Sequence, residues 1–113
     1  MEEDQSTARF MAVVEQIGKS APVAIDATGA ALIAAVHLGI GSDSRSLSNR
    51  LGIAHALVLR EINSLSGKML TIVKRDTRTQ RTFVALPNEA ETLALSASEI
   101  WLKRSLSTAP DMP

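Results

Sequence analysis

The chain has 113 residues, of which 45% are hydrophobic, and it contains no cysteine. This composition predicts one domain with its own core, and it excludes a disulfide framework, a thiolate nucleophile and a cysteine-based zinc site. The longest apolar stretch, residues 30–38, is interrupted by His37 and is too short to span a bilayer. The opening Glu2-Glu3-Asp4 has the wrong charge for a secretory signal or a transit peptide, so we expect a cytoplasmic protein without membrane contact.

Residues that support catalysis or metal binding do not cluster in this sequence. The two histidines, His37 and His55, are eighteen residues apart and do not have the spacing of a metal site. There is no Ser-His-Asp signature, no glycine-rich phosphate loop and no His-Glu-x-x-His helix. We therefore expect no cofactor, no metal and no catalytic residue, and a small enzyme remains only a distant alternative.

Two helices are expected in the first 38 residues. Residues 6–18 carry one apolar stripe with helical spacing, formed by Phe10, Val13, Val14 and Ile17, and Gly18 is the expected end. Asp26 is a candidate N-cap for a second helix that runs to about Leu38 and is apolar on every side. Such a helix belongs at the centre of a fold or in a subunit interface.

A pair of short helices is expected next. The polar turn at residues 41–46 offers serine and aspartate caps for a helical piece over 47–51, which Gly52 closes. A further helix over 54–66 has its apolar positions at Leu57, Val58, Ile62 and Leu65.

The pattern then changes to strands. Residues 70–75 and 81–86 are rich in β-branched side chains, and the polar residues 76–80 between them predict a hairpin tip. Pro87 ends the second strand, and Asn88 is expected to cap a last helix over 88–104. We expect the Ser/Pro-rich residues 105–113 to be a disordered tail.

The formal net charge of zero hides an uneven distribution. The segment from Arg45 to Arg81 holds eight basic and two acidic residues, a net charge of +6, and the rest of the chain carries −6. Such a segment indicates either a binding surface for a polyanion, of which nucleic acid is the commonest, or a solvated face. Charge alone leaves both interpretations open.

Two short helices joined at a glycine, followed by a hairpin with a basic tip, describe a winged helix-turn-helix. We therefore predict a single α+β, mainly helical domain, with the helix-turn-helix and wing in residues 26–86. In this arrangement the first helix and the core fix the second helix, whose outward face is free to enter a major groove. The helices over 1–20 and 88–104 are expected to pair two copies, because the amphipathic first helix and the fully apolar second helix leave more apolar surface than a monomer of this size easily hides.

Residues 44–93 resemble the multiple-antibiotic-resistance regulator (MarR) family of bacterial transcription factors. The resemblance covers Leu47-Ser48-Asn49-Arg50-Leu51-Gly52-Ile53 and Val58-Leu59-Arg60-Glu61-Ile62-Asn63-Ser64-Leu65. Its most specific part is the wing motif D-x-R-x-x-R within Lys74-Arg75-Asp76-Thr77-Arg78-Thr79-Gln80-Arg81, and Leu86-Pro87-Asn88-Glu89-Ala90 stands where that family has L-T-x-x-G. The resemblance implies a homodimeric regulator that reads a pseudo-palindromic DNA site, in some members under the control of a small effector ligand.

The resemblance and the residue types together predict the DNA contacts. In the family the arginine that matches Arg78 enters a minor groove, and Asp76 and Arg81 would brace the wing by an ion pair. Arg60 could read guanine or grip a phosphate, Asn63 could read adenine, and Ala56 could touch a thymine methyl group. The full candidate set is Arg45, His55, Ala56, Arg60, Asn63, Lys68, Lys74, Arg75, Arg78 and Arg81.

The alternative is a winged-helix module that binds a protein partner. The expected recognition helix begins with Ala54, His55, Ala56 and Leu57, followed by Leu59, where the family usually has serine and threonine. If Ala56, Leu57 and Leu59 point outward, they form a bare apolar patch; if they point inward, they belong to the core. Trp101 and His37 are expected to pack in a core or interface, with ligand stacking as the other role for Trp101.

Overall fold

The computed structural model describes residues 2–107, with side chains for residues 7–104. Five helices and one antiparallel hairpin make a mainly helical α+β fold, as predicted. Their order is α1 (Glu2–Ser20), α2 (Ala27–His37), α3 (Ser44–Leu51), α4 (His55–Leu65), β1 (Thr71–Asp76), β2 (Arg81–Ala85) and α5 (Asn88–Ser107). No helix among residues 2–107 combines the length and the apolar character needed to cross a membrane.

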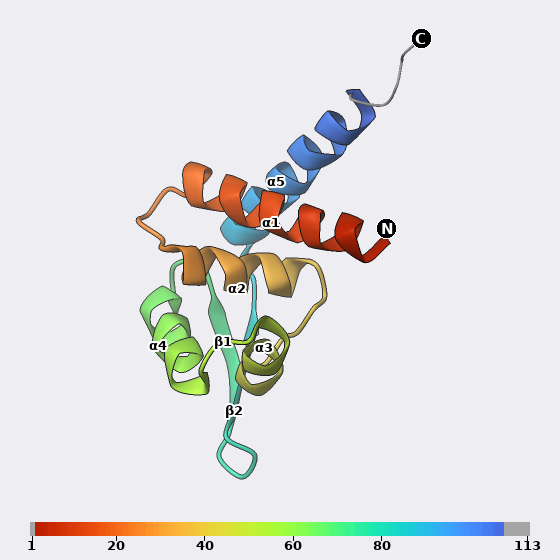
Figure 1. The fold of residues 1–113 in the computed structure, drawn as a ribbon. Helices are drawn as coiled ribbons and strands as arrows, with labels where there is room; N and C mark the ends of the chain where they lie inside the picture. The colour runs from red at the N-terminus through yellow and green to blue at the C-terminus, as the bar shows by residue number, and fades with distance from the viewer. Residues whose placement is uncertain (1, 108–113) are drawn as a thin grey trace.

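Helix α2 lies at the centre of the fold, as its apolar sequence predicts. In Figure 1 it crosses the middle of the molecule, with α1 and α5 on one side and α3, α4 and the hairpin on the other. Six of its eleven residues are buried. The predicted cap is confirmed, because an oxygen of Asp26 accepts a hydrogen bond from the Gly29 N–H at 2.9 Å.

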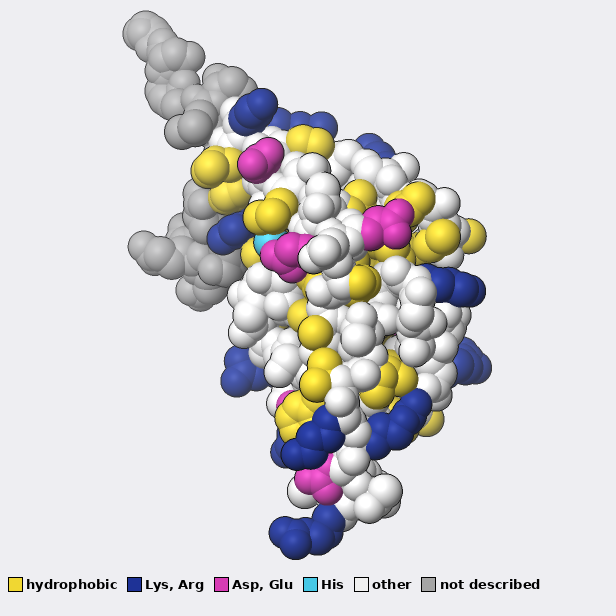
Figure 2. All heavy atoms as spheres, turned by 180° about the vertical axis from the view of Figure 1, so that it is seen from behind, with side chains coloured by type: hydrophobic (Ala, Val, Ile, Leu, Met, Phe, Trp, Pro, Cys, Tyr) yellow, Lys and Arg dark blue, Asp and Glu magenta, His cyan; other side chains and the backbone are white. Residues whose placement is uncertain are grey.

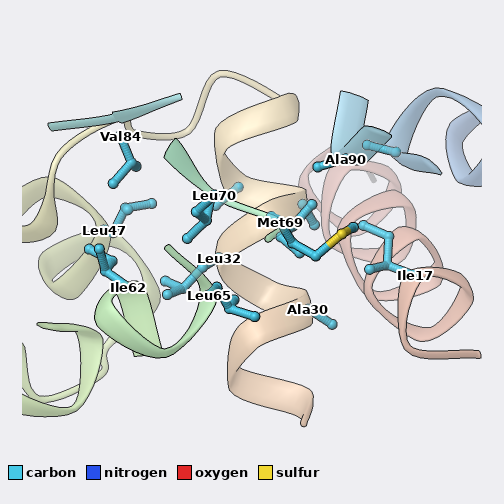
Figure 3. Close-up of a cluster of buried hydrophobic side chains, with 14 of the residues drawn as sticks. Ile17, Ala30, Leu32, Leu47, Ile62, Leu65, Met69, Leu70, Val84 and Ala90 are labelled. Atoms are coloured by element: carbon cyan, nitrogen blue, oxygen red, sulfur yellow. The ribbon is translucent and has the colours of Figure 1, made fainter. Parts of the chain in front are cut away.

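The core is one cluster that joins both sides of α2. Leu32, Leu47, Ile62 and Leu70 belong to this cluster on the side of the short helices, and Figure 3 shows the Met69 side chain extending toward Ile17 of α1. Met69 leaves only 1% of its surface exposed. Its flexible thioether suits the irregular space between the α4–β1 connection and the terminal helices.

The ends of the two terminal helices differ from the prediction. Helix α1 passes through Gly18 and ends at Ser20, because Pro22 disfavours a helical conformation in the residue before it. Helix α5 includes Ser105–Ser107, so the expected tail is wrong for these three residues; a formed helix gains one backbone hydrogen bond per added residue. Residues 108–113 of that tail lie outside the described residues. Asn88 is the first residue of α5, and the carbonyl of Pro87 accepts from the Glu91 N–H.

The hairpin is held between α3 and α4 by its second strand. β1 pairs with β2, and the other edge of β2 takes the turn before α3, where the Val84 N–H donates to the Ser42 carbonyl at 2.9 Å. Asp43 and Phe83 form a bridge in the same place. In Figure 1 the tip of the hairpin extends past the ends of α3 and α4.

The carboxyl groups of Glu61 on α4 and of Asp26, the N-cap of α2, lie close together. Burial, the charge of Asp26 and a hydrogen bond with Asp26 raise the pKa of Glu61, and the charge of Arg60 opposes the shift. The folded state therefore binds the Glu61 proton more tightly than the unfolded chain does. This contribution to stability declines as the pH rises from the ordinary value of 4.5 through the raised pKa.

Replacing Glu61 by glutamine should remove this decline. A glutamine amide donates to Asp26 without a charge, so we expect Glu61→Gln to raise the free energy of unfolding at pH 7 by about 1 kcal/mol. Urea unfolding between pH 4 and pH 8 measures the effect. Glu15→Gln, at a side chain that is 69% exposed on α1, is the matched control. A variant less stable than the wild type at pH 7 would contradict the interpretation.

Candidate nucleic-acid interface

The predicted contact residues lie on α3, on α4, in the turn after α4 and on the hairpin. His55, Ala56, Arg60 and Asn63 are on α4, Arg45 is on α3, Lys68 follows α4, and Lys74, Arg75, Arg78 and Arg81 are on the hairpin. Lys and Arg side chains crowd the hairpin end of the face in Figure 2. The Lys74 ammonium also lies over the Phe83 ring, 5.6 Å from its centroid.

A groove of about 440 Å³ separates α4 from the hairpin. His55, Leu59 and Asn63 line it from α4, and Arg75 and Arg81 line it from the strands. One contact crosses the groove, because Nη2 of Arg75 donates to Oδ1 of Asn63 at 3.3 Å. Both side chains are exposed, so each remains accessible to a ligand. The groove brings together His55, Asn63, Arg75 and Arg81 of the predicted set.

Other predicted residues lie outside this groove. Arg60 is exposed on α4 near the Asp26–Glu61 contact, and its charge lowers the pKa of Glu61. Ala56 is exposed at the start of α4, and Lys68 is exposed in the turn after it. Arg78 is exposed at the hairpin tip, where its backbone N–H donates to Oδ1 of Asp76 at 3.0 Å.

Asp43 and Ser44, here called the Asp43–Ser44 junction, position the interface. Asp43 caps α3: its Oδ2 accepts from the backbone N–H groups of Arg45 and Ser46, both at 3.0 Å. Its Oδ1 accepts from the Ser46 hydroxyl at 2.8 Å. Burial alone would raise the pKa of the Asp43 carboxyl, but the hydrogen bonds from Ser46 and Arg81 and the charge of Arg81 hold it below its usual value.

The same carboxylate anchors the second strand of the hairpin. Nη1 of Arg81 donates to Oδ2 of Asp43 at 2.7 Å, and only 9% of the Asp43 side chain is exposed. The expected ion pair between Asp76 and Arg81 is therefore wrong, although the two residues face each other across the strands. Asp76 instead accepts from the backbone N–H groups of Arg78 and Thr79 and so closes the hairpin tip. The buried Asp43 offers Arg81 a better-shielded partner than the tip carboxylate does.

Ser44 connects three elements although its side chain is fully buried. Its Oγ accepts from the Thr82 N–H on β2 at 3.0 Å and lies 2.9 Å from Nε2 of His55 on α4. His55 is therefore half-buried and in contact with Ser44. Burial and the charge of Arg45 lower the pKa of His55, and the charge of Asp43 partly opposes them.

Arg45 also reaches the hairpin. Its Nη2 donates to Oε1 of Gln80 at 2.7 Å, and Gln80 has a left-handed backbone with φ 59°. A left-handed conformation is costly for a residue with a side chain, so this contact helps to hold the last residue of the tip in place. The sequence predicts Asp43 and Ser44 only as possible helix caps, and Gln80 only as part of the hairpin tip. No local pattern connects residues that are 35–38 positions apart in the chain.

His37 and Trp101, which were expected to pack in a core or interface, lie away from the hairpin, beside α5 and on it. His37 has a side chain only 10% exposed, and its Nε2 lies 3.1 Å from the Ser98 Oγ of α5. Trp101 is half-buried, with the Arg9 guanidinium 5.9 Å from its ring centroid.

Comparison of the chain with protein-family models, with curated proteins and with solved structures gave no match in any of the three.

Two substitutions at Asp43 should destabilise the fold by different amounts. Asp43→Asn keeps a capping oxygen but loses the charge beside Arg81, and Asp43→Ala loses both contributions. We expect Asp43→Ala to lower the free energy of unfolding by about 2–3 kcal/mol, and Asp43→Asn by about 1 kcal/mol. Chemical denaturation at pH 7 measures both values, with Ser42→Ala as the neighbouring control.

The pH dependence gives a second measure of the same carboxylate. Because the pKa of Asp43 is lowered in the folded state, its stabilising effect is present above its ordinary value of 3.8 and is lost as the pH falls through the lowered pKa. Both variants should lose this acid-sensitive contribution. Equal stabilities of wild type and Asp43→Ala at pH 7 would contradict the role of the junction.

Proposed function

We propose that the chain is a winged helix-turn-helix protein that binds double-stranded DNA as a homodimer and regulates transcription, as the MarR-family resemblance implies. The observation that carries the proposal is the arrangement at the hairpin end of the molecule. There the exposed side of α4, the basic groove and the projecting tip lie together, and the Asp43–Ser44 junction fixes their relative positions.

Helix α4 has the features of a reading helix. Val58, Ile62 and Leu65 are buried on one side, and Ala56, Arg60 and Asn63 are exposed. Gly52 turns the chain between α3 and α4 with a left-handed φ of 68°. An exposed helix side with arginine and asparagine fits a major groove, where these residue types bond to guanine and adenine.

The start of α4 is also suited to a phosphate. Its N-cap residue is Ala54, which provides no side-chain hydrogen bond to the first turn. The free N–H groups of a helix start carry a partial positive charge and bind phosphate oxygens. Arg45 of α3 and the groove arginines add positive charge on the same side.

The apolar residues of α4 do not favour the protein-binding alternative. Leu57 and Leu59 are half-buried, and Leu59 lines the groove together with charged and polar side chains. Of the three residues that could have formed a bare apolar patch, only Ala56 is exposed. An alanine alone offers too little apolar surface to anchor a protein partner.

The terminal helices support the homodimer part of the proposal. The outer half of α5 extends away from the body of the molecule in Figure 1. Leu95 and Leu102 are two helical turns apart on α5 and are 48% and 52% exposed. With Arg9 and Trp101 they line a hollow of about 330 Å³ between α1 and α5. A second copy packed here would cover this apolar surface.

A selection from a random duplex pool tests the function directly. We expect enrichment of a pseudo-palindromic sequence, because a two-fold symmetric dimer presents α4 twice. A dimer that neutralises on the order of six to ten phosphates should lose affinity with a log–log salt slope of roughly −5 to −9. Absence of duplex binding at about 50 mM salt would overturn the proposal.

Two substitutions separate the hairpin tip from α4 on the selected duplex. Arg78→Ala should weaken binding most where the flanking sequence is A/T-rich, because a narrow minor groove attracts arginine. Arg60→Ala should cost about 1–3 kcal/mol and relax specificity at one base position. Lys19→Ala, on the exposed side of α1, is the charge-matched control. Unchanged affinity of both variants, with their circular dichroism intact, would mean that this surface does not contact DNA.

The dimer is tested at α5. Leu95→Glu combined with Leu102→Glu should give a folded monomer in sedimentation, because two buried carboxylates would oppose the interface. Val23→Glu, between α1 and α2, makes the same chemical change at a residue that is 38% exposed and should remain dimeric. A dimeric α5 variant would show that the copies pair elsewhere.

A further inference from the structure

His55 occupies an unusual position for a titratable group at the candidate interface. It is the first residue of α4, it lines the groove, and its Nε2 is tied to the buried Ser44. The proposed function uses the arginines around it but assigns no role to its proton.

The Ser44 hydroxyl favours the neutral form of His55. Its Oγ already accepts the Thr82 N–H, and the one hydroxyl proton of this fully buried side chain requires an acceptor. Unprotonated Nε2 of His55, 2.9 Å away, is such an acceptor. A protonated imidazole donates from Nε2 instead, and the Ser44 hydroxyl then loses this acceptor.

Burial and the nearest positive charge act in the same direction. The charge of Arg45 of α3 acts on the imidazole, and Arg75 of β1 and Arg81 of β2 line the same groove. Among the carboxylates, Asp43 holds Arg81 but still acts against the shift, whereas Asp76 closes the hairpin tip and Glu61 contacts Asp26. Burial and the charge of Arg45 lower the pKa of His55.

We propose that His55 is a proton-linked phosphate contact, neutral in the free protein and protonated when a nucleic-acid phosphate occupies the groove beside it. A phosphate at Arg45 and His55 would offset the positive charge that keeps the imidazole neutral, and would attract the imidazolium. Binding would then take up one proton per protomer. This inference rests on the proposed function, because it names how the same site is regulated.

The consequence is a pH-dependent affinity. Linkage requires that a ligand which favours protonated His55 binds more tightly as the pH falls, by at most about tenfold per pH unit for each proton taken up. The dependence is confined to the range between the pKa of His55 in the free protein and in the complex. Outside that range the affinity no longer depends on the pH through His55.

The experiment is a titration of the full chain with the selected duplex between pH 5.5 and pH 8.5 at constant ionic strength. We expect wild-type affinity to rise at least fivefold toward acidic pH, and His55→Gln to abolish this rise while keeping a polar side chain opposite Ser44. His37→Gln, at the only other histidine of the chain, should keep the wild-type pH profile.

A measurement on the wild-type protein keeps the test valid if a variant fails to fold. The pKa of the His55 imidazole, followed by NMR, should rise when the duplex is added. Duplex binding with an unchanged imidazole pKa, or with the same pH profile in wild type and His55→Gln, would overturn this inference and leave the proposed function intact. Absence of duplex binding at every pH would overturn both.

Discussion

The buried hydrogen bonds of the Asp43–Ser44 junction are the constraint on which the arrangement of α3, α4 and the hairpin depends. Two adjacent side chains cap α3, hold Arg81 of β2, accept the Thr82 N–H and contact His55 of α4. These groups are polar and largely buried, so a displaced partner would leave an unsatisfied donor or acceptor at a cost of about 1–3 kcal/mol. The hairpin and the two short helices are therefore fixed as one unit.

Helix α4 is bound to this unit at its start and to α2 at its middle, and both contacts involve titratable groups whose environment favours the neutral form. Burial and Arg45 disfavour the charged His55, and burial and Asp26 disfavour the charged Glu61. Both residues belong to the helix that is proposed to read DNA, so their protonation would couple the pH to the proposed interface. This is a physical reason to study binding and stability as functions of pH together.

The local sequence was sufficient for most of the secondary structure. The period-3.6 apolar stripe of α1, the all-apolar α2 with Asp26 before it, and the β-branched runs of the hairpin each carry their signal within a few residues, and all are present in the structure. The helix ends were predicted less accurately, because several neighbouring residues together decide where a helix stops. Helix α1 continues through Gly18, and α5 continues through Ser105. The concentration of basic residues from 45 to 81 was also visible in the sequence alone, since charge counts need no coordinates.

The pairing of side chains was decided only by the tertiary structure. The wing motif suggested that Asp76 would partner Arg81, but folding brings the buried Asp43 within 2.7 Å of Arg81 and leaves Asp76 to its own turn. The same long-range packing turns His55 toward Ser44 and lays Leu59 in the groove. Local propensity acts over the few residues of one turn, whereas these contacts join residues 11 to 38 positions apart. Their strength depends on burial, which is a property of the whole fold.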